Sequence, residues 1–396
     1  MSELKLCCVD PESELLVSCA RAHIDPVRAE QIARLLAQDL NWERLLKLAQ
    51  RNGLIPLLFF HLNQICAADV PREHYDFLWD YFQKNTAFNL LLTGELLRLL
   101  QALNESGVSA VAYKGPATAA RLYGNISLRQ FCDLDVLVRE SDVWKATELL
   151  IASGFEPHFI IPLKKQEAFI RLSYVRLFRR EAGRILVELH WRIAPRFFAV
   201  RFDTAALWPR LETIKIRGAN VSVPGAEDLL LMLCVHGAKD CWEKLEWVTC
   251  VAELIHGKPE LDWQLIWRQS RQMRCERMLR LGLLLAHDLL DAPLPVEALD
   301  RIRESRELSA RARAVVQDFF SESPRRRTFS FKLTFHLALK DKALDKLRHC
   351  ARLALTTTPV DWAMTPLPRS LSFVYPLLRA ARLTKKYAFD AERAQN

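Results

Sequence analysis

Two aspartates one residue apart, Asp133 and Asp135, carry the clearest chemical signal in this chain. They begin the run Asp-Leu-Asp-Val-Leu-Val at residues 133–138, whose apolar side chains predict a buried strand. Since successive side chains of a strand point to opposite faces, both carboxylates lie on the same face. Two unpaired carboxylates repel each other unless a positive group lies between them. Mg²⁺ is commonly held by a few carboxylates together with substrate phosphates, so the pattern predicts a divalent-cation site.

A third acid, Glu188, lies at the centre of a second apolar run, Ile-Leu-Val-Glu-Leu-His-Trp at residues 185–191. Alternation puts Glu188, His190 and Arg192 on one face of this strand. An isolated buried carboxylate must be paired or neutralised, so an acid in such a run is unusual. If the two strands are neighbours, three carboxylates surround one point. That ligand set suits two-metal phosphoryl or nucleotidyl transfer, in which one ion activates the attacking hydroxyl and the other stabilises the triphosphate.

A Lys114-Gly115 turn before the first strand supplies the groups that a phosphate needs. Gly115 lets the backbone approach a phosphate closely, and the helix that follows begins with free N–H groups. Lys114 would lie against the triphosphate as a point charge, and Arg129 would clamp it from the other side. Each feature has a structural alternative: a Lys-Gly turn is common, and Glu188 alone is typical of a salt-bridged sheet residue. The combination, in this order and spacing, favours a functional site.

These segments resemble the nucleotidyltransferase superfamily that includes DNA polymerase beta. The resemblance rests on Lys114-Gly115, an Ala-rich helix ending in Leu-Tyr-Gly, Arg129, the strand at 133–138 and a helix ending at Gly154-Phe155. A closer resemblance, to its bacterial family of uncharacterised nucleotidyltransferases, rests on residues 188–192, 224–228 and 236–239 with Trp242 and Trp247. The resemblance covers most of the chain and is densest from 107 to 257.

This resemblance implies dependence on Mg²⁺ (or Mn²⁺) and transfer of a nucleoside monophosphate from an NTP. On that basis Asp133, Asp135 and Glu188 are the catalytic metal ligands. It implies, further, that Lys114, Gly115 and Arg129 bind the nucleotide. The acceptor that it favours is a saccharide, a peptide or a small molecule rather than nucleic acid.

The sequence departs from the superfamily pattern in several respects, one of which is a longer stretch between Gly115 and Asp133 than in minimal members. The usual Gly-Ser turn is replaced by Lys-Gly-Pro at 114–116, and Asp240 and Cys250 stand where the family would have a His and an Asp. The two latter changes predict an altered acceptor pocket. Nearby, His236 and Lys239 fall on one helix face and would reach the active cleft, although a helical His among leucines is more often a core residue.

The surrounding elements predict an α+β fold with a nucleotidyltransferase-like mixed β-sheet core and large helical regions on both sides. We expect helices over most of 1–104, the catalytic core at 105–223, a helical domain at 224–322 and a basic helical region at 323–396. Within the core, strands are expected at 108–113 and 155–161 and a hairpin at 174–192. Further on, we expect one helix over 264–290, an Arg-rich linker at 325–327, and one helix over 329–355, before a Pro-rich end.

The sequence has no run of about 18 uncharged apolar residues and no signal-peptide pattern at its start, so we expect a cytoplasmic protein. The 396 residues include 10 Cys without a C-x-x-C pair, which predicts reduced and mostly buried thiols. Residues 321–396 hold 15 Lys/Arg against six Asp/Glu, so this segment accounts for the whole net charge of +9. A basic segment of this kind fits an anionic partner or a membrane surface, and Phe329, Phe331 and Phe335 would enter a membrane from an amphipathic helix. A solvated helix face is the alternative.

Three functions follow from these observations. The first is an Mg²⁺-dependent nucleotidyltransferase. The second is a non-catalytic adaptor that keeps the fold and docks through its basic C-terminal region. The third is a toxin-type transferase that acts on tRNA. Three converging acids favour an enzyme, because an adaptor has no need to retain them.

Overall fold

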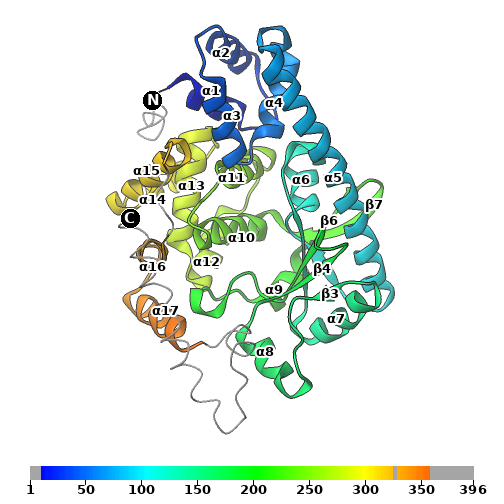
Figure 1. Ribbon diagram of the computed structural model, residues 1–396. Coiled ribbons are helices and arrows are strands. Elements are labelled where there is room, and N and C mark those ends of the chain that lie inside the picture. The colour runs from blue at the N-terminus through cyan, green and yellow to red at the C-terminus, as the bar shows by residue number, and fades with distance from the viewer. Residues whose placement is uncertain (1–9, 324–327, 357–396) are drawn as a thin grey trace, which may run out of the picture.

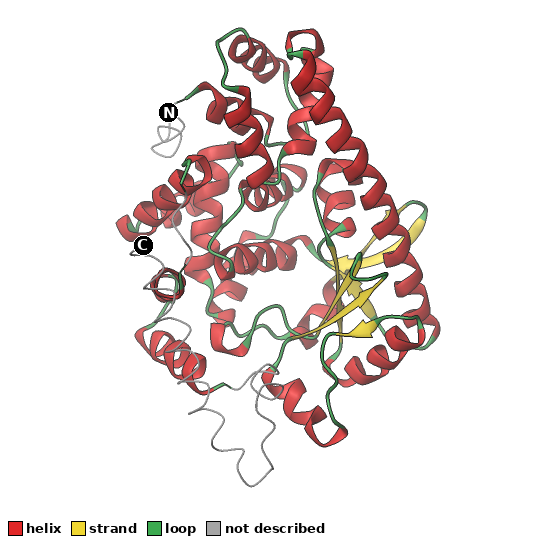
Figure 2. Ribbon diagram, in the orientation of Figure 1, coloured by secondary structure: helices red, strands yellow, loops and turns green. Residues whose placement is uncertain are grey.

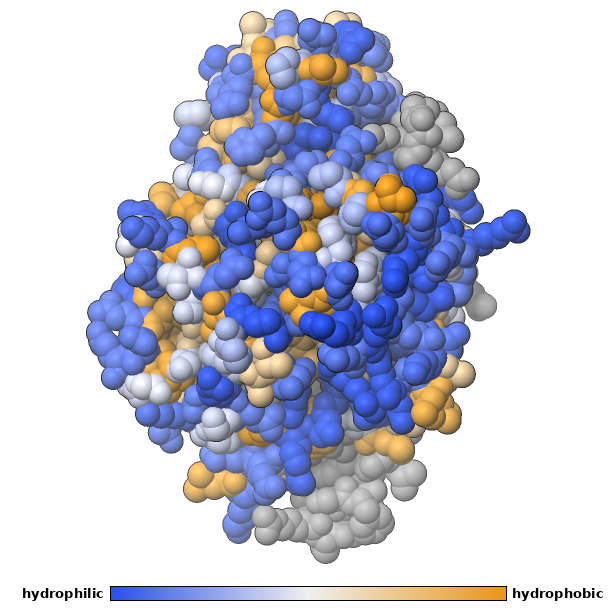
Figure 3. Space-filling view, turned by 180° about the vertical axis from the view of Figure 1, so that it is seen from behind, coloured by the Kyte–Doolittle hydropathy of each residue, from blue (hydrophilic) through white to orange (hydrophobic). Residues whose placement is uncertain are grey.

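A small mixed sheet lies on one side of a largely helical molecule (Figure 1, Figure 2). This computed structural model describes residues 10–323 and 328–356. It confirms the α+β class and the mixed sheet core between helical regions. The face seen in Figure 3 is mostly hydrophilic, with hydrophobic side chains in small separate groups.

The main sheet has the strand order β1-β2-β5-β4-β3. Its strands are β1 (Ala110–Ala112), β2 (Asp133–Val138), β3 (Glu156–Pro157), β4 (Val175–Arg180) and β5 (Ile185–His190). Strands β2 and β5 are parallel, whereas β1 pairs with β2, and β4 with both β3 and β5, in antiparallel fashion. The expected hairpin is therefore present as β4 and β5. A separate hairpin is formed by β6 (Leu211–Ile216) and β7 (Ala219–Pro224).

Alternation along β2 divides its side chains between two environments. Leu134, Val136 and Val138 are fully buried against the long helix α5 (Arg72–Glu105) and against α7 (Val143–Ala152). The aspartates point to the other face of the sheet, as the period of two requires. One face of the central strands is thus fixed by apolar packing, and this leaves the opposite face for polar groups.

Helices precede the sheet, as the sequence predicts. They are α1 (Pro11–Cys19), α2 (Pro26–Leu36), α3 (Trp42–Arg51), α4 (Ile55–Ile65) and α5. Three of them begin at side-chain caps, in which Asp10, Asp25 and Asn41 accept a hydrogen bond from a backbone N–H of the first turn. Within and after the sheet region, the short helices are α6 (Pro116–Tyr123), α8 (Gln166–Leu172) and α9 (Thr204–Leu207).

The helices that follow the sheet form the other large part of the core. They are α10 (Ala226–Lys239), α11 (Leu245–Gly257), α12 (Trp263–Met273), α13 (Glu276–Leu290), α14 (Val296–Arg303), α15 (Arg306–Phe320), α16 (Phe329–Ala338) and α17 (Ala343–Leu355). Trp242, which is fully buried, lies in the gaps that Gly237 on α10 and Gly282 on α13 leave open. A Cβ at Gly237 would lie 2.7 Å from the Trp242 ring, so the glycine permits this packing.

Three sequence expectations were wrong in extent. The strand expected at 155–161 is reduced to Glu156–Pro157, and the His158 N–H makes one further hydrogen bond of 2.8 Å to the Leu177 carbonyl of β4. The helix expected at 264–290 is two helices, since Arg274 adopts the left-handed conformation (φ +59°) between them. The helix expected at 329–355 is α16 and α17.

Of the three aromatic residues expected to enter a membrane from α16, Phe335 is not available for such a contact. Phe335 is 2% exposed and belongs to the hydrophobic core, and Phe331 packs against the same core. The Arg-rich linker at 325–327 and the Pro-rich end lie outside the described residues. No helix within 10–323 or 328–356 combines the length and apolar character needed to cross a membrane. The cysteines of these segments are free thiols, most of them buried, as expected.

Candidate active site

The three acids predicted from the sequence lie on one face of the sheet. Strand β5 runs parallel to β2 in a register that places Glu188 directly beside Asp135. Asp133 lies two residues earlier on β2 and therefore points to the same side. Asp135 is almost fully buried, whereas Asp133 and Glu188 are partly exposed. The two strands that carry the acids are therefore neighbours in the sheet, as the predicted site requires.

His190 belongs to the same cluster, although no metal-binding role was predicted for it from the sequence. Its Nε2 lies 3.0 Å from Asp135 Oδ1 and 3.0 Å from Glu188 Oε2. Oxygen and nitrogen atoms of Asp135, Glu188 and His190 lie within 4.8 Å of one another, close enough to share a metal ion. The signal was available, because His190 is two residues after Glu188 on the same strand face.

Lys114 faces the carboxylates from the turn after β1. Its Nζ donates a hydrogen bond of 2.8 Å to Asp135 Oδ1. Burial favours the neutral amine, but the charge of Asp135 outweighs burial and raises the pKa of Lys114. The Lys114 ammonium therefore neutralises part of the negative charge that the acids gather.

The two aspartates have opposite electrostatic environments. Burial favours the protonated form of Asp135, but Lys114 and the His190 hydrogen bond hold its pKa well below the usual range. Burial, together with repulsion from Asp135 and Glu188, raises the pKa of Asp133 to about 6. Asp133 is therefore the carboxylate whose negative charge is least compensated by the protein itself.

Gly115 fixes the turn that carries Lys114. Its φ of +55° lies in the region that favours glycine, and a Cβ there would lie 3.1 Å from the Asp133 carbonyl oxygen. The missing side chain thus lets the turn approach the start of β2. Helix α6 begins at the next residue, Pro116, so Gly115 and the first turn of α6 lie beside the carboxylates.

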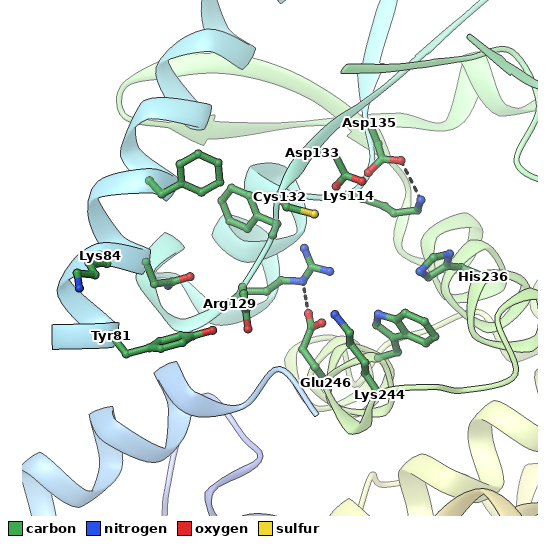
Figure 4. A pocket seen from close by; sticks show the side chains of 16 residues that line it. Tyr81, Lys84, Lys114, Arg129, Cys132, Asp133, Asp135, His236, Lys244 and Glu246 are labelled. Atoms are coloured by element: carbon green, nitrogen blue, oxygen red, sulfur yellow. Dashed lines mark hydrogen bonds and ion pairs between the residues drawn. The ribbon is translucent and has the colours of Figure 1, made fainter. Parts of the chain in front are cut away.

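Arg129 connects the loop before β2 to helix α11. Its Nε lies 2.5 Å from Glu246 Oε1, and both side chains are buried (Figure 4). Burial opposes the charge, but Glu246 outweighs it and raises the pKa of Arg129. The Arg129 carbonyl accepts a hydrogen bond of 2.7 Å from Asn89 of α5. Arg129 lines the same pocket as the acids, but one edge of its guanidinium is committed to Glu246.

These groups surround a pocket of about 470 Å³. Figure 4 shows Asp133, Asp135 and Lys114 on one wall, His236 on another, and the Arg129–Glu246 pair between α5 and α11. Its lining residues are Tyr81, Lys84, Asn85, Phe88, Lys114, Gly115, Arg129, Gln130, Phe131, Cys132, Asp133, Asp135, His236, Lys244, Glu246 and Trp247. The volume lies in the range of small-molecule sites, which is roughly 300–1,000 Å³.

His236 lines this pocket, which is the less favoured of the two alternatives that the sequence left open for it. The centre of its ring lies 4.8 Å from that of Trp247, with the two ring planes tilted by 60°, and Nδ1 lies 3.4 Å from Asp240 Oδ2. Burial, with the nearby charges of Lys114 and Lys239, lowers the pKa of His236 well below its ordinary value. Asp240, which differs from the family pattern, therefore contacts a residue that lines the pocket, His236.

Cys250, the other departure, lies behind the Arg129–Glu246 pair. Its Sγ is 3.5 Å from the Tyr123 hydroxyl and 3.8 Å from Glu246 Oε1. An aspartate at this position would place a second carboxylate beside Arg129. With cysteine there, Glu246 is the carboxylate that pairs with the guanidinium.

The residues present fit a divalent cation. Asp133, Asp135 and Glu188 offer carboxylate oxygens, the donors that Mg²⁺ and Mn²⁺ prefer. His190 adds an imidazole nitrogen, a donor that suits transition metals. The three predicted acids lie on one face of the sheet, but the group close enough to share one ion is Asp135, Glu188 and His190, without Asp133. The role of the three acids as ligands stays a prediction.

Comparisons with known proteins identify a family for this chain. Residues 38–291, more than half of the chain, match the family described as "Uncharacterised nucleotidyltransferase". A solved structure of an antigenic nucleotidyltransferase-like protein from Paracoccidioides brasiliensis is similar at 19% identity, with a TM-score of 0.31 over 53% of this chain and 96% of that chain. A search of curated proteins found no match. From the extent of the family match, this chain belongs to the uncharacterised nucleotidyltransferase family.

Proposed function

We propose that the protein is an Mg²⁺- or Mn²⁺-dependent nucleotidyltransferase that moves a nucleoside monophosphate from an NTP to an acceptor. The observation that carries this proposal is the parallel register that places Glu188 beside Asp135, with Asp133 on the same face. Family membership supports the reaction class. The partly exposed Asp133 opens onto the pocket, so ligands and substrate have access to the acids.

In this proposal Asp133, Asp135 and Glu188 hold the metal. When bound, the ion stabilises phosphate charge and lowers the pKa of the attacking hydroxyl. A bond forms between the acceptor oxygen and the α-phosphorus, and the bond from that phosphorus to the pyrophosphate oxygen breaks. Pyrophosphate leaves with the electron pair, and the acceptor proton is released to water.

The protein's own cations orient the triphosphate. Lys114 is within reach of both Asp135 and the pocket, and it would exchange part of its contact with the carboxylate for a phosphate oxygen. The free edge of the Arg129 guanidinium would contact a second oxygen, while Glu246 holds its other edge. Such fixed charges act by positioning the reactants and by stabilising the transition state.

The acceptor that we propose is a saccharide, a peptide or a small molecule. The pocket is concave and small, and its lining balances four cationic side chains against three carboxylates. A nucleic-acid site relies instead on a basic surface that follows the phosphate backbone. This balance supports a compact acceptor.

The test incubates the full-length protein with each labelled NTP, Mg²⁺ or Mn²⁺, and a cell extract. Label is expected on a saccharide, peptide or small molecule. Asp135→Asn and Glu188→Gln should each reduce transfer by at least about 10²-fold, the scale of losing one transition-state contact. Asp76→Asn, an exposed carboxylate of α5, is the matched control and should leave transfer unchanged.

The outcomes separate the alternatives. Label on tRNA would favour a toxin-type transferase. The non-catalytic adaptor would be favoured if no NTP supports transfer and if Asp135→Asn binds NTP as well as the wild-type protein does. Transfer that survives in both carboxylate variants would contradict the proposed site.

A further inference from the structure

Helix α17 presents an apolar stripe to solvent. Leu344, Leu347 and Leu355 are 51%, 65% and 61% exposed. Ala351 and Ala354, between them, are exposed as well. At 3.6 residues per turn, these five positions fall within about 100° of the helix surface. The leucines therefore form one continuous strip rather than scattered exposed residues.

The opposite face of α17 is held firmly by the protein. Asp345 and His349 are 1% and 0% exposed. Asp345 forms ion pairs with Arg274 and with Arg348, and the His349 ring lies 6.0 Å from that of Phe197. Because this face is buried, α17 has a fixed orientation, and its leucine stripe points away from the core.

Arginines border the stripe. Arg348 and Arg352 follow it along the helix, and Arg352 Nη1 donates to the Arg196 carbonyl at 3.1 Å. Burial is the largest cause that lowers the pKa of Arg352. The positive charges of four other arginines lower this pKa further: Arg196, Arg348, Arg201 and Arg274. Five guanidinium groups thus gather around this end of α17, and Asp345, which pairs with two of them, is buried beneath.

We propose that α17 docks the protein onto an anionic phospholipid surface. Exposed leucines flanked by fixed arginines are the arrangement of helices that lie in a membrane interface. The leucines would enter the boundary of headgroups and acyl chains, and the arginines would contact lipid phosphates. In Figure 1, α17 lies at the lower margin of the molecule, away from the sheet, so docking would not obstruct the pocket.

Charge argues against two other occupants of the stripe. A second copy that docked by the same face would bring two arginine clusters together, at a cost in repulsion. Residues 357–396 carry six Lys/Arg and three Asp/Glu, so this segment is itself basic. Neither a second copy nor residues 357–396 would supply a net negative charge to pair with the arginines, whereas an anionic lipid surface would.

The test measures co-sedimentation of the full-length protein with phosphatidylcholine vesicles and with vesicles containing 30% phosphatidylglycerol. We expect binding to the anionic vesicles that weakens with salt. Leu344→Ser with Leu347→Ser should weaken it at least about tenfold, since two leucines leave the interface. Arg352→Gln should weaken it about fivefold, the effect of one basic residue at an anionic surface. Val27→Ser with Val296→Ser is the matched control, because these valines are equally exposed on other helices.

Each other outcome overturns the proposal. Failure of the wild-type protein to bind anionic vesicles refutes lipid docking. Equal binding by the leucine variant shows that another segment, such as residues 357–396, makes the contact. If the wild-type protein self-associates without vesicles and the leucine variant does not, the stripe binds a second copy of the chain. Thermal denaturation of each variant shows whether it is folded, and nucleotidyl transfer is not needed for any of these readouts.

Discussion

One carboxylate oxygen of Asp135 contacts both a lysine ammonium and a histidine ring nitrogen. Oδ1 accepts from Lys114 Nζ at 2.8 Å and lies 3.0 Å from His190 Nε2. A divalent ion bound by Asp135, Asp133 and Glu188 would compete with the ammonium for the same oxygen. Lys114 therefore acts as an internal counter-ion that stabilises the cluster when no metal neutralises it.

Lys114→Met should separate metal binding from nucleotide binding. Loss of the competing ammonium leaves Asp135 with less positive charge, so Mn²⁺ should bind at least about threefold more tightly in the absence of nucleotide. NTP affinity should fall, because a phosphate contact is lost. Titration of Mn²⁺ by electron paramagnetic resonance and of NTP by calorimetry measures the two effects. Asp135→Asn, which removes a ligand, should instead weaken Mn²⁺ binding, and weaker binding in Lys114→Met would contradict the counter-ion role.

At the scale of elements, the pocket depends on how helix α11 is joined to the start of β2. The Arg129–Glu246 ion pair makes this connection, and the Asn89 contact to the Arg129 carbonyl adds α5. Two helices from different parts of the chain thus hold the loop that delivers Asp133.

Arg129→Met should destabilise the protein strongly. The change leaves the buried Glu246 without its partner, and breaking a buried pair from one side costs about 3–5 kcal/mol. The free energy of unfolding from urea denaturation measures this loss. Lys84→Met is the matched control, because Lys84 lines the same pocket but is exposed and pairs with Asp80 on its own helix. A change of less than about 1 kcal/mol in Arg129→Met would show that the pair does not hold α11 in place.

At the scale of the whole molecule, buried histidines on distant helices make the stability of the fold depend on pH. Burial lowers the pKa of His61 and of His336 to about 4 and that of His349 to about 3. His61 is on α4, where it contacts the Arg21 carbonyl at 2.7 Å, with Arg21 and His23 as its charged neighbours. His336 and His349 are on α16 and α17, next to Lys340.

The protein should lose stability as the pH falls from 6.5 toward 4. The ordinary histidine pKa is 6.5, so between pH 6.5 and 4 these three histidines bind more protons in the unfolded chain than in the folded one. The stability is thus fully present above pH 6.5 and is lost on acidification. His61→Gln, which keeps a donor for the Arg21 carbonyl, should flatten the pH dependence by on the order of 1–3 kcal/mol. Urea denaturation at pH 7 and pH 4.5 gives the difference; an exposed histidine variant, His158→Gln, should leave the slope as in the wild type.

The C-terminal helices are also part of the core at this scale. Phe335 and Leu339 belong to the hydrophobic core shared with α10 to α13. Removal of everything beyond residue 323 would therefore expose that core. Point substitutions on the outward face of α17 avoid this problem.

Local sequence alone determined much of this protein. Side-chain alternation predicted β2, β5 and their polar face, and capping residues such as Asp25 and Asn41 marked where helices begin. These features depend on neighbours a few residues apart, so they can be predicted from the sequence. The family resemblance followed from the same short motifs.

Tertiary structure alone decided which groups meet. His190 and Asp135 are 55 residues apart in the chain, and their contact depends on the parallel pairing of β2 with β5. The partner of Arg129 is likewise Glu246 on a later helix, and not a neighbour in sequence. The outward face of the basic region proved to be the leucine stripe of α17, whereas Phe335 of α16 is buried. Local patterns fix the periodicity of an element, but only the packing of distant elements determines which of its faces remains open to a ligand.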